Sequence, residues 1–295
     1  KSTSENNVTK AGGDGIGFNR RSTVSLYSNW GELRLGRDKN PLYDGFNDFD
    51  PFGGDTVGAA YMWQAGREMY NNTTAVKRVS NSIGYHLPKD LGGLYGRVMV
   101  AFGEQSSDAP ASNIYKGDGD FAGIYAGYDN KGPFTAGASY GKTKYSYYVP
   151  KAKGGDLTNY QLGATYDFKV VKLWALYSHD TVGASVAHQE LNGSGWSLGL
   201  TAPIGKGNLA ASYSTYKWNN GYDQKGKPYY VGTPDGDKFS VGYFYSMSKR
   251  TWLYGALGTI SMNDGLDTPL AGSKFNSGTL SGRSTGIDLG IRHSF

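Results

Sequence analysis

Apolar and polar residues alternate with a period of two along most of the chain. The clearest example is residues 160–168, YQLGATYDF, where aromatic and aliphatic residues occupy every second position and polar or small residues lie between them. Successive side chains of a β-strand point to opposite faces, so this pattern predicts a strand with one apolar and one polar face.

The same pattern predicts thirteen strands in all. They cover residues 15–29, 32–37, 78–86, 92–103, 121–128, 134–141, 160–168, 170–178, 196–202, 209–216, 239–246, 252–260 and 284–295. In residues 78–86, for example, Val79, Ile83 and Tyr85 are predicted to share the apolar face, opposite Arg78. Residues 1–14 are polar and glycine-rich, which predicts a loop.

The connections between these strands alternate between short turns and long polar loops. That arrangement is typical of an all-β, up-and-down antiparallel transmembrane barrel, with aromatic residues at the two ends of the apolar face. The polar face is rich in Gly, Ser and Thr, so we expect side chains to leave a water-filled channel inside the barrel. A soluble β-sandwich also alternates, but its solvent face carries many charges. A soluble β-rich binding or adhesion protein is therefore the less favoured alternative.

Composition narrows the function further. The 295 residues include 45 Gly and 24 Tyr but no Cys, and the net charge is +5. An apolar run long enough for a helical membrane span is absent from the sequence. Scattered basic residues do not favour nucleic-acid binding. The four His lie on separate segments without the spacing of a metal site or catalytic triad, so we expect no metal, no cofactor and no enzyme activity.

One stretch, from Arg37 to Arg78, does not alternate. A connection of this length inside a compact domain is usually functional. We expect residues 1–295 to form a single barrel domain. We expect residues from about 38 to 77 to form a loop that folds into the interior of this barrel. This loop carries four acids, Asp44, Asp48, Asp50 and Asp55. Alternation places four arginines on the polar face of the wall, Arg21, Arg34, Arg78 and Arg97, and Arg37 is expected to anchor the loop.

Four stretches of the sequence also resemble a known family. They are residues 18–26 with 31–37 (FNRRSTVSL and GELRLGR), residues 51–56 (PFGGDT), residues 248–255 (SKRTWLYG) and residues 290–295 (GIRHSF). The chain resembles the general bacterial porins, most closely the Comamonas-type anion-selective porins of β-proteobacteria. The resemblance implies a sixteen-stranded barrel, so we expect that the family's first three strands are missing before residue 1.

The resemblance also implies a function and a cellular location. It implies a homotrimer in the outer membrane of a Gram-negative bacterium, in contact with lipid and lipopolysaccharide, that passes ions and small hydrophilic solutes. The loop acids would face wall arginines at a constriction. Arg20 would join Arg78 there, although alternation aims Arg20 outward. Phe295 would be the signal for barrel assembly.

An excess of wall arginines over lumen acids predicts a mild preference for anions. The alternative within the same fold is a channel specific for organic acids or sugars. Such a channel would carry large aromatic residues in its lumen, and Trp174 is the candidate for that role.

Overall fold

The computed structural model describes residues 2–7, 17–60, 77–104, 117–144, 156–183, 190–218, 236–262 and 283–294. Within these ranges a single sheet contains 14 strands, and each strand pairs antiparallel with the next along the chain. The strands are β1 (Ser2–Asn7), β2 (Gly17–Ser28), β3 (Gly31–Lys39), β4 (Arg78–His86), β5 (Leu94–Ala101), β6 (Phe121–Asp129), β7 (Phe134–Thr143), β8 (Leu157–Asp167), β9 (Lys172–Val182), β10 (Leu191–Ile204), β11 (Gly207–Trp218), β12 (Gly236–Ser248), β13 (Thr251–Met262) and β14 (Arg283–His293).

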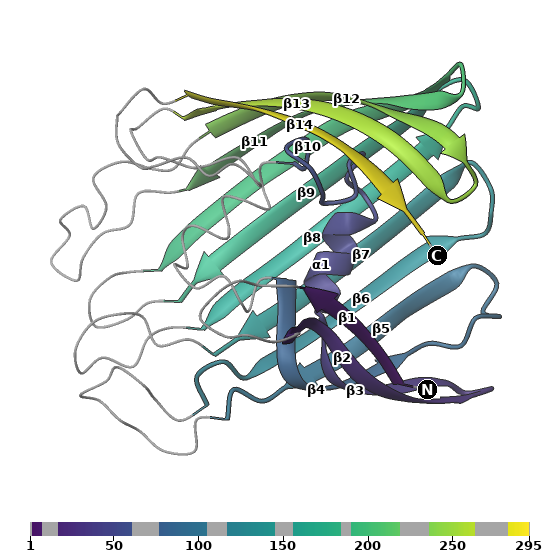
Figure 1. Ribbon diagram of the computed structural model, residues 1–295. Helices are drawn as coiled ribbons and strands as arrows, with labels where there is room; N and C mark the ends of the chain where they lie inside the picture. Colours follow the sequence, from purple (N-terminus) through teal and green to yellow (C-terminus); the bar gives the residue numbers. More distant parts are fainter. Residues whose placement is uncertain are drawn as a thin grey trace, which may run out of the picture.

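The sheet curves around a central space, and the helix α1 (Pro41–Asn47) lies inside it (Figure 1). The described short connections all join an even-numbered strand to the following odd-numbered one, so they lie at one rim. In the described residues β1 and β14 are the two edge strands of the sheet, and they are not paired with each other. The all-β, up-and-down architecture predicted from alternation is confirmed.

The strand count differs from the prediction by one. The thirteen predicted strands correspond to β2–β14, whereas the loop predicted for residues 1–14 is wrong for Ser2–Asn7, which form β1. This segment, STSENN, has no apolar alternation, and it is held by backbone pairing along β2, as in Ser2 opposite Val24. The sheet of the described residues therefore has an even number of strands, one more than predicted.

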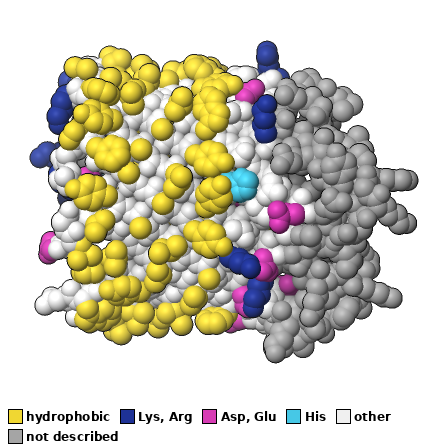
Figure 2. Space-filling view, turned by 180° about the vertical axis from the view of Figure 1, so that it is seen from behind, with side chains coloured by type: hydrophobic (Ala, Val, Ile, Leu, Met, Phe, Trp, Pro, Cys, Tyr) yellow, Lys and Arg dark blue, Asp and Glu magenta, His cyan; other side chains and the backbone are white. Residues whose placement is uncertain are grey.

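Side-chain exposure follows the predicted alternation on most strands. On β5, Val98 and Val100 are 47% and 43% exposed, whereas Arg97 and Met99 are 5% and 2% exposed. The outward side chains form an apolar surface with charged residues at its two margins (Figure 2). In the described part of the chain, no helix has the length and apolar character needed to cross a membrane.

A bulge changes this alternation on β4. The register between β3 and β4 shifts between Gly36 and Asp38, and Asn81 adopts a φ of 54°. One extra residue on a strand reverses which side chains face inward. Val79 therefore packs inside the barrel with Met99, and its predicted position on the apolar outer face beside Ile83 is wrong.

The connection between β3 and β4 was predicted to be irregular throughout, but part of it is regular. β3 continues to Lys39, and α1 follows at once. The Asn40 side chain caps this helix by accepting a hydrogen bond from the Tyr43 N–H (2.9 Å). The Asn40 N–H donates to the Lys77 carbonyl (3.1 Å), which joins the two ends of the connection. We call residues Asn40–Lys77 the inserted loop; its residues 61–76 lie outside the described ranges.

Candidate pore constriction

A cavity of about 160 Å³ lies where the inserted loop leaves the wall. The strands β2 to β5 supply most of its lining, and α1 supplies one acid. The four arginines that alternation places on the polar face all line this one cavity, together with two acids, a lysine and a histidine. The lining residues are Arg21, Arg34, Asp38, Lys39, Asp44, Arg78, His86 and Arg97.

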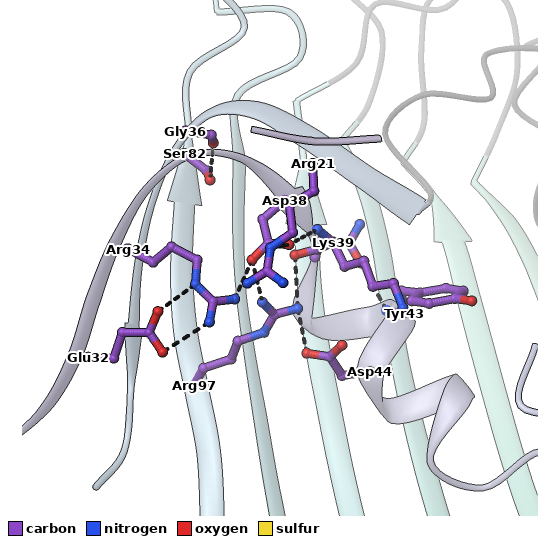
Figure 3. A network of polar contacts seen from close by, with 11 residues as sticks. Arg21, Glu32, Arg34, Gly36, Asp38, Lys39, Tyr43, Asp44, Ser82 and Arg97 are labelled. Carbon is purple, nitrogen blue, oxygen red and sulfur yellow. Dashed lines mark hydrogen bonds and ion pairs between the residues drawn. The ribbon is translucent and has the colours of Figure 1, made fainter. Parts of the chain in front are cut away.

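Asp38 is the centre of this arrangement (Figure 3). Its carboxylate accepts a hydrogen bond from Arg34 Nη1 (2.6 Å) and lies 3.4 Å from Arg21 Nε and 3.6 Å from Arg97 Nη1. The side chain is only 5% exposed. Sequence reasoning assigned Asp38 to the start of the loop and missed this role. Its even-numbered register with Glu32 and Arg34 on β3 is the signal that could have found it.

Two of the wall arginines have further carboxylate partners. Arg34 makes a bidentate pair with Glu32 through Nε (2.7 Å) and Nη2 (2.9 Å). Arg97 donates to the Lys39 carbonyl (2.8 Å) and pairs with Asp44 on α1. Such charge-assisted pairs are short and directional. Arg34 is therefore held within the wall, and Arg97 joins the wall to the helix.

The four loop acids have different surroundings. Asp44 meets Arg97, and burial raises its pKa to about 6. Asp48 accepts hydrogen bonds from the hydroxyls of Tyr125 (2.7 Å) and Tyr95 (3.3 Å) on the wall.

The other two acids are opposites in exposure. Asp50 accepts from the Gly54 N–H (2.7 Å) and closes the turn, and burial raises its pKa to about 6. Asp55 is exposed. The geometry thus separates three acids that hold the loop from one that is open to the lumen.

Among the described residues, neither Arg20 nor Arg37 lines the cavity around Asp38. Arg20 is exposed, as its register with Val24 implies, but its charge acts on Tyr43 and Lys77 of the inserted loop. Arg37 donates to Ser80 Oγ on β4 (2.7 Å), so it contacts the wall. Phe295 lies outside the described residues.

The inserted loop packs onto glycines of the barrel wall. Phe49 lies against Gly163 on β8, and Pro51 lies against Gly199 on β10. A methyl group added at either glycine would overlap the loop side chain. The small residues of the polar face were expected to leave only water inside, but part of that space is filled by the loop.

Lys238 on β12 fastens the far side of the loop. It is 1% exposed and donates to the Ala59 carbonyl (2.5 Å). Beside it, Phe52 and Val57 of the loop form an apolar cluster with small residues of β11 and β13. The described part of the loop is thus fixed from β3 across the interior to β12, which makes it a static narrowing of the barrel.

The comparisons with known proteins give the family. A family model described as a Gram-negative porin matches residues 2–265. The chain belongs to the Gram-negative porin family. It is a channel-forming protein of the outer membrane, as the predictions from the sequence stated, and the proteins of this family that it matches are channels rather than enzymes.

Two porins are similar over nearly the whole chain. Outer membrane porin protein 32 of Delftia acidovorans is 32% identical over 291 residues, covering 95% of this chain and 75% of the relative. An outer membrane porin protein of Bordetella pertussis is 30% identical over 315 residues, covering 96% of this chain and 73% of the relative.

Solved porin structures have the same fold. An anion-selective porin from Comamonas acidovorans superposes with a TM-score of 0.77 at 28% identity, covering 95% of this chain and 79% of that one. OmpT of Vibrio cholerae in its trimer form has a TM-score of 0.65 at 14% identity, covering 97% and 83%, a likeness of fold alone.

Proposed function

We propose that this porin is a passive diffusion channel for ions and small hydrophilic solutes with a mild preference for anions. The observation that carries the preference is the charge of the cavity lining, where five cationic side chains stand against two carboxylates. A cleft lined by one sign of charge concentrates counter-ions, and rings of charge tune the selectivity of a pore. The inserted loop narrows the barrel beside this cluster, so permeating ions pass close to it.

The wall arginines contribute unequally in this proposal. Asp38 and Glu32 offset much of the charge of Arg34, as Asp44 does for Arg97. Arg78 lines the same cavity at the junction of β4 and the inserted loop, and we propose it as the principal wall charge that meets the solute. Arg20, whose charge acts on Tyr43 and Lys77, would add to it. Likeness to the porin described as anion-selective supports the same direction.

Two partners belong to the proposal. We expect three copies to assemble, as the resemblance to general porins implies. The apolar outer surface, with its charged margins, fits lipid and lipopolysaccharide (Figure 2).

A substrate-specific channel is the second candidate, and one observation favours it. Trp174 on β9 faces the lumen side, donates to Thr201 Oγ1 (3.1 Å), and carries the Lys172 ammonium 4.2 Å from its ring centroid. An aromatic ring with an adjacent cation suits a sugar or an organic acid. Conductance that saturates with solute concentration would favour this candidate over general diffusion.

Charge reversal of Arg78 tests the proposed function. Arg78→Glu replaces a cation in the cavity lining with an anion, so the ratio of anion to cation permeability is expected to fall by about fivefold or more, since two unit charges about 4 Å apart interact by roughly 1 kcal/mol even in water. Planar-bilayer reversal potentials measure this ratio.

Arg250→Glu is the matched control, because Arg250 is exposed in the short turn between β12 and β13. At 0.1 M salt, an exposed charge more than about 10 Å from the ion path is largely screened. The substitution at the turn should therefore change the permeability ratio only slightly. Equal shifts from both substitutions would show that selectivity follows net charge, and the constriction at Arg78 would be refuted.

A further inference from the structure

The side chains of two lysines lie near one tyrosine ring, where the inserted loop joins β3 and β4. Lys39, the last residue of β3, places Nζ 4.7 Å from the centroid of the Tyr43 ring (Figure 3). Lys77, the residue before β4, places Nζ 4.3 Å from the same centroid. Tyr43 is 2% exposed, so its ring is a fixed support for both ammonium groups.

We propose that Lys39 and Lys77, held on the Tyr43 ring, form a binding site for small oxyanions inside the pore. The site rests on the proposed anion preference and adds to it, because it names the side chains that an anion contacts where the inserted loop joins β3 and β4. Neither lysine was among the residues predicted from the sequence.

These lysines differ from the wall arginines in their charge balance. In the described ranges, Arg21, Arg34 and Arg97 have Asp38 within ion-pairing distance. No carboxylate of the described residues lies within that distance of either lysine Nζ. A face of an aromatic ring attracts an ammonium without neutralising it, so both cations keep their capacity to bind an anion.

An oxyanion suits two ammonium groups better than a halide does. Each ammonium has three N–H donors, and a tetrahedral or carboxylate anion offers several acceptor oxygens to receive them. Arg78 and Lys39 both line the adjoining cavity, where cationic side chains outnumber carboxylates, so an anion approaches the two lysines through a region of net positive charge.

The surroundings of Lys77 give this site a pH dependence. Burial lowers the pKa of Lys77 to about 8, helped by the charges of Arg78, Lys39 and Arg20 and opposed by Asp55. Burial raises the pKa of the Tyr43 phenol to about 12, so the ring stays neutral. Lys77 is charged below its folded pKa, and its positive charge is lost as the pH rises through about 8.

Sulfate block of chloride current tests the proposal. Sulfate is a suitable probe because it keeps the same charge over the range used, from about pH 7 to about pH 9.5, where Asp44 and Asp50 are already ionised. The concentration for half block of the wild-type porin in planar bilayers is expected to rise about fivefold or more over this range, as one nearby charge is lost.

Three variants identify the group responsible. Lys77→Arg keeps a charge at every pH used and should show half block that is nearly independent of pH. Lys77→Gln should need the higher sulfate concentration at both pH values. Lys89→Gln removes the same charge from an exposed position between β4 and β5 and should behave as the wild type.

Two outcomes would overturn the proposal. One is sulfate block at about pH 7, where Lys77 of the wild type is charged, that is equal in Lys77→Gln and in the wild type. The other is an unchanged pH dependence in the conservative Lys77→Arg variant. A wild-type porin that prefers cations at about pH 7 would instead refute the proposed function, so the two failures are distinguishable.

Discussion

Replacing Asp38 with asparagine is expected to destabilise the folded barrel by about 3–5 kcal/mol, the range seen when one partner of a buried ion pair is removed. Asp38 is the shared carboxylate of Arg21, Arg34 and Arg97, and its side chain is 5% exposed. Without that charge, the three guanidinium groups repel one another at the junction of β2, β3 and β5. Urea unfolding in lipid vesicles, followed by heat-modifiable gel mobility, measures the change.

The same substitution should also increase the preference for anions, because it removes a carboxylate from the cavity lining. Asp129→Asn is the matched control. Asp129 pairs with Lys131, whose side chain is 87% exposed, in the turn between β6 and β7. An exposed pair of this kind contributes about 0–1 kcal/mol. Equal stability losses in the two variants would contradict the central role of Asp38.

A single methyl group at Gly163 is expected to displace the inserted loop. Gly163 on β8 faces Phe49, which is 1% exposed, and an alanine Cβ there would overlap the ring. The strand cannot retreat, because β8 is paired with β7 on one side and β9 on the other. Overpacking of this kind costs about 1–3 kcal/mol. Urea unfolding should show that loss, and single-channel recordings should show altered, noisier conductance.

Gly84→Ala is the control for this prediction. Gly84 is also a strand glycine of the barrel, but the nearest heavy atom to an added Cβ is Met99 Cε at 3.4 Å, an ordinary contact. Its conductance should match that of the wild type. If Gly163→Ala also kept the wild-type conductance and stability, Phe49 would not be held as the structure shows.

The barrel could be predicted from the sequence because its signal is local. On β5, alternation alone separates exposed Val98 from buried Arg97. The same parity rule places Arg21, Arg34 and Arg97, from three strands, on one cavity. A strand without apolar residues, β1, gives no such signal, since its pairing depends on β2. The bulge at Asn81 turns Val79 inward and so interrupts the alternation. The sequence around Asn81 has no residue pattern from which this bulge could be predicted.

The candidate site was harder to predict because its contacts join distant parts of the chain. Lys238 meets Ala59 across 179 positions, and no local pattern indicates that pairing. The lumen glycines were interpreted as empty space, although Gly163 and Gly199 are where the loop packs. Asp38 looked like the first residue of a loop, whereas its role comes from three arginines on three different strands.

The zero-current potential of the wild-type porin in a KCl gradient tests the proposed anion preference most directly. A basic constriction passes chloride more readily than potassium, so the dilute side should become negative relative to the concentrated side. The measurement should be made at about pH 7, where Lys77 carries its charge. A dilute side that becomes positive would show cation preference and would contradict the account.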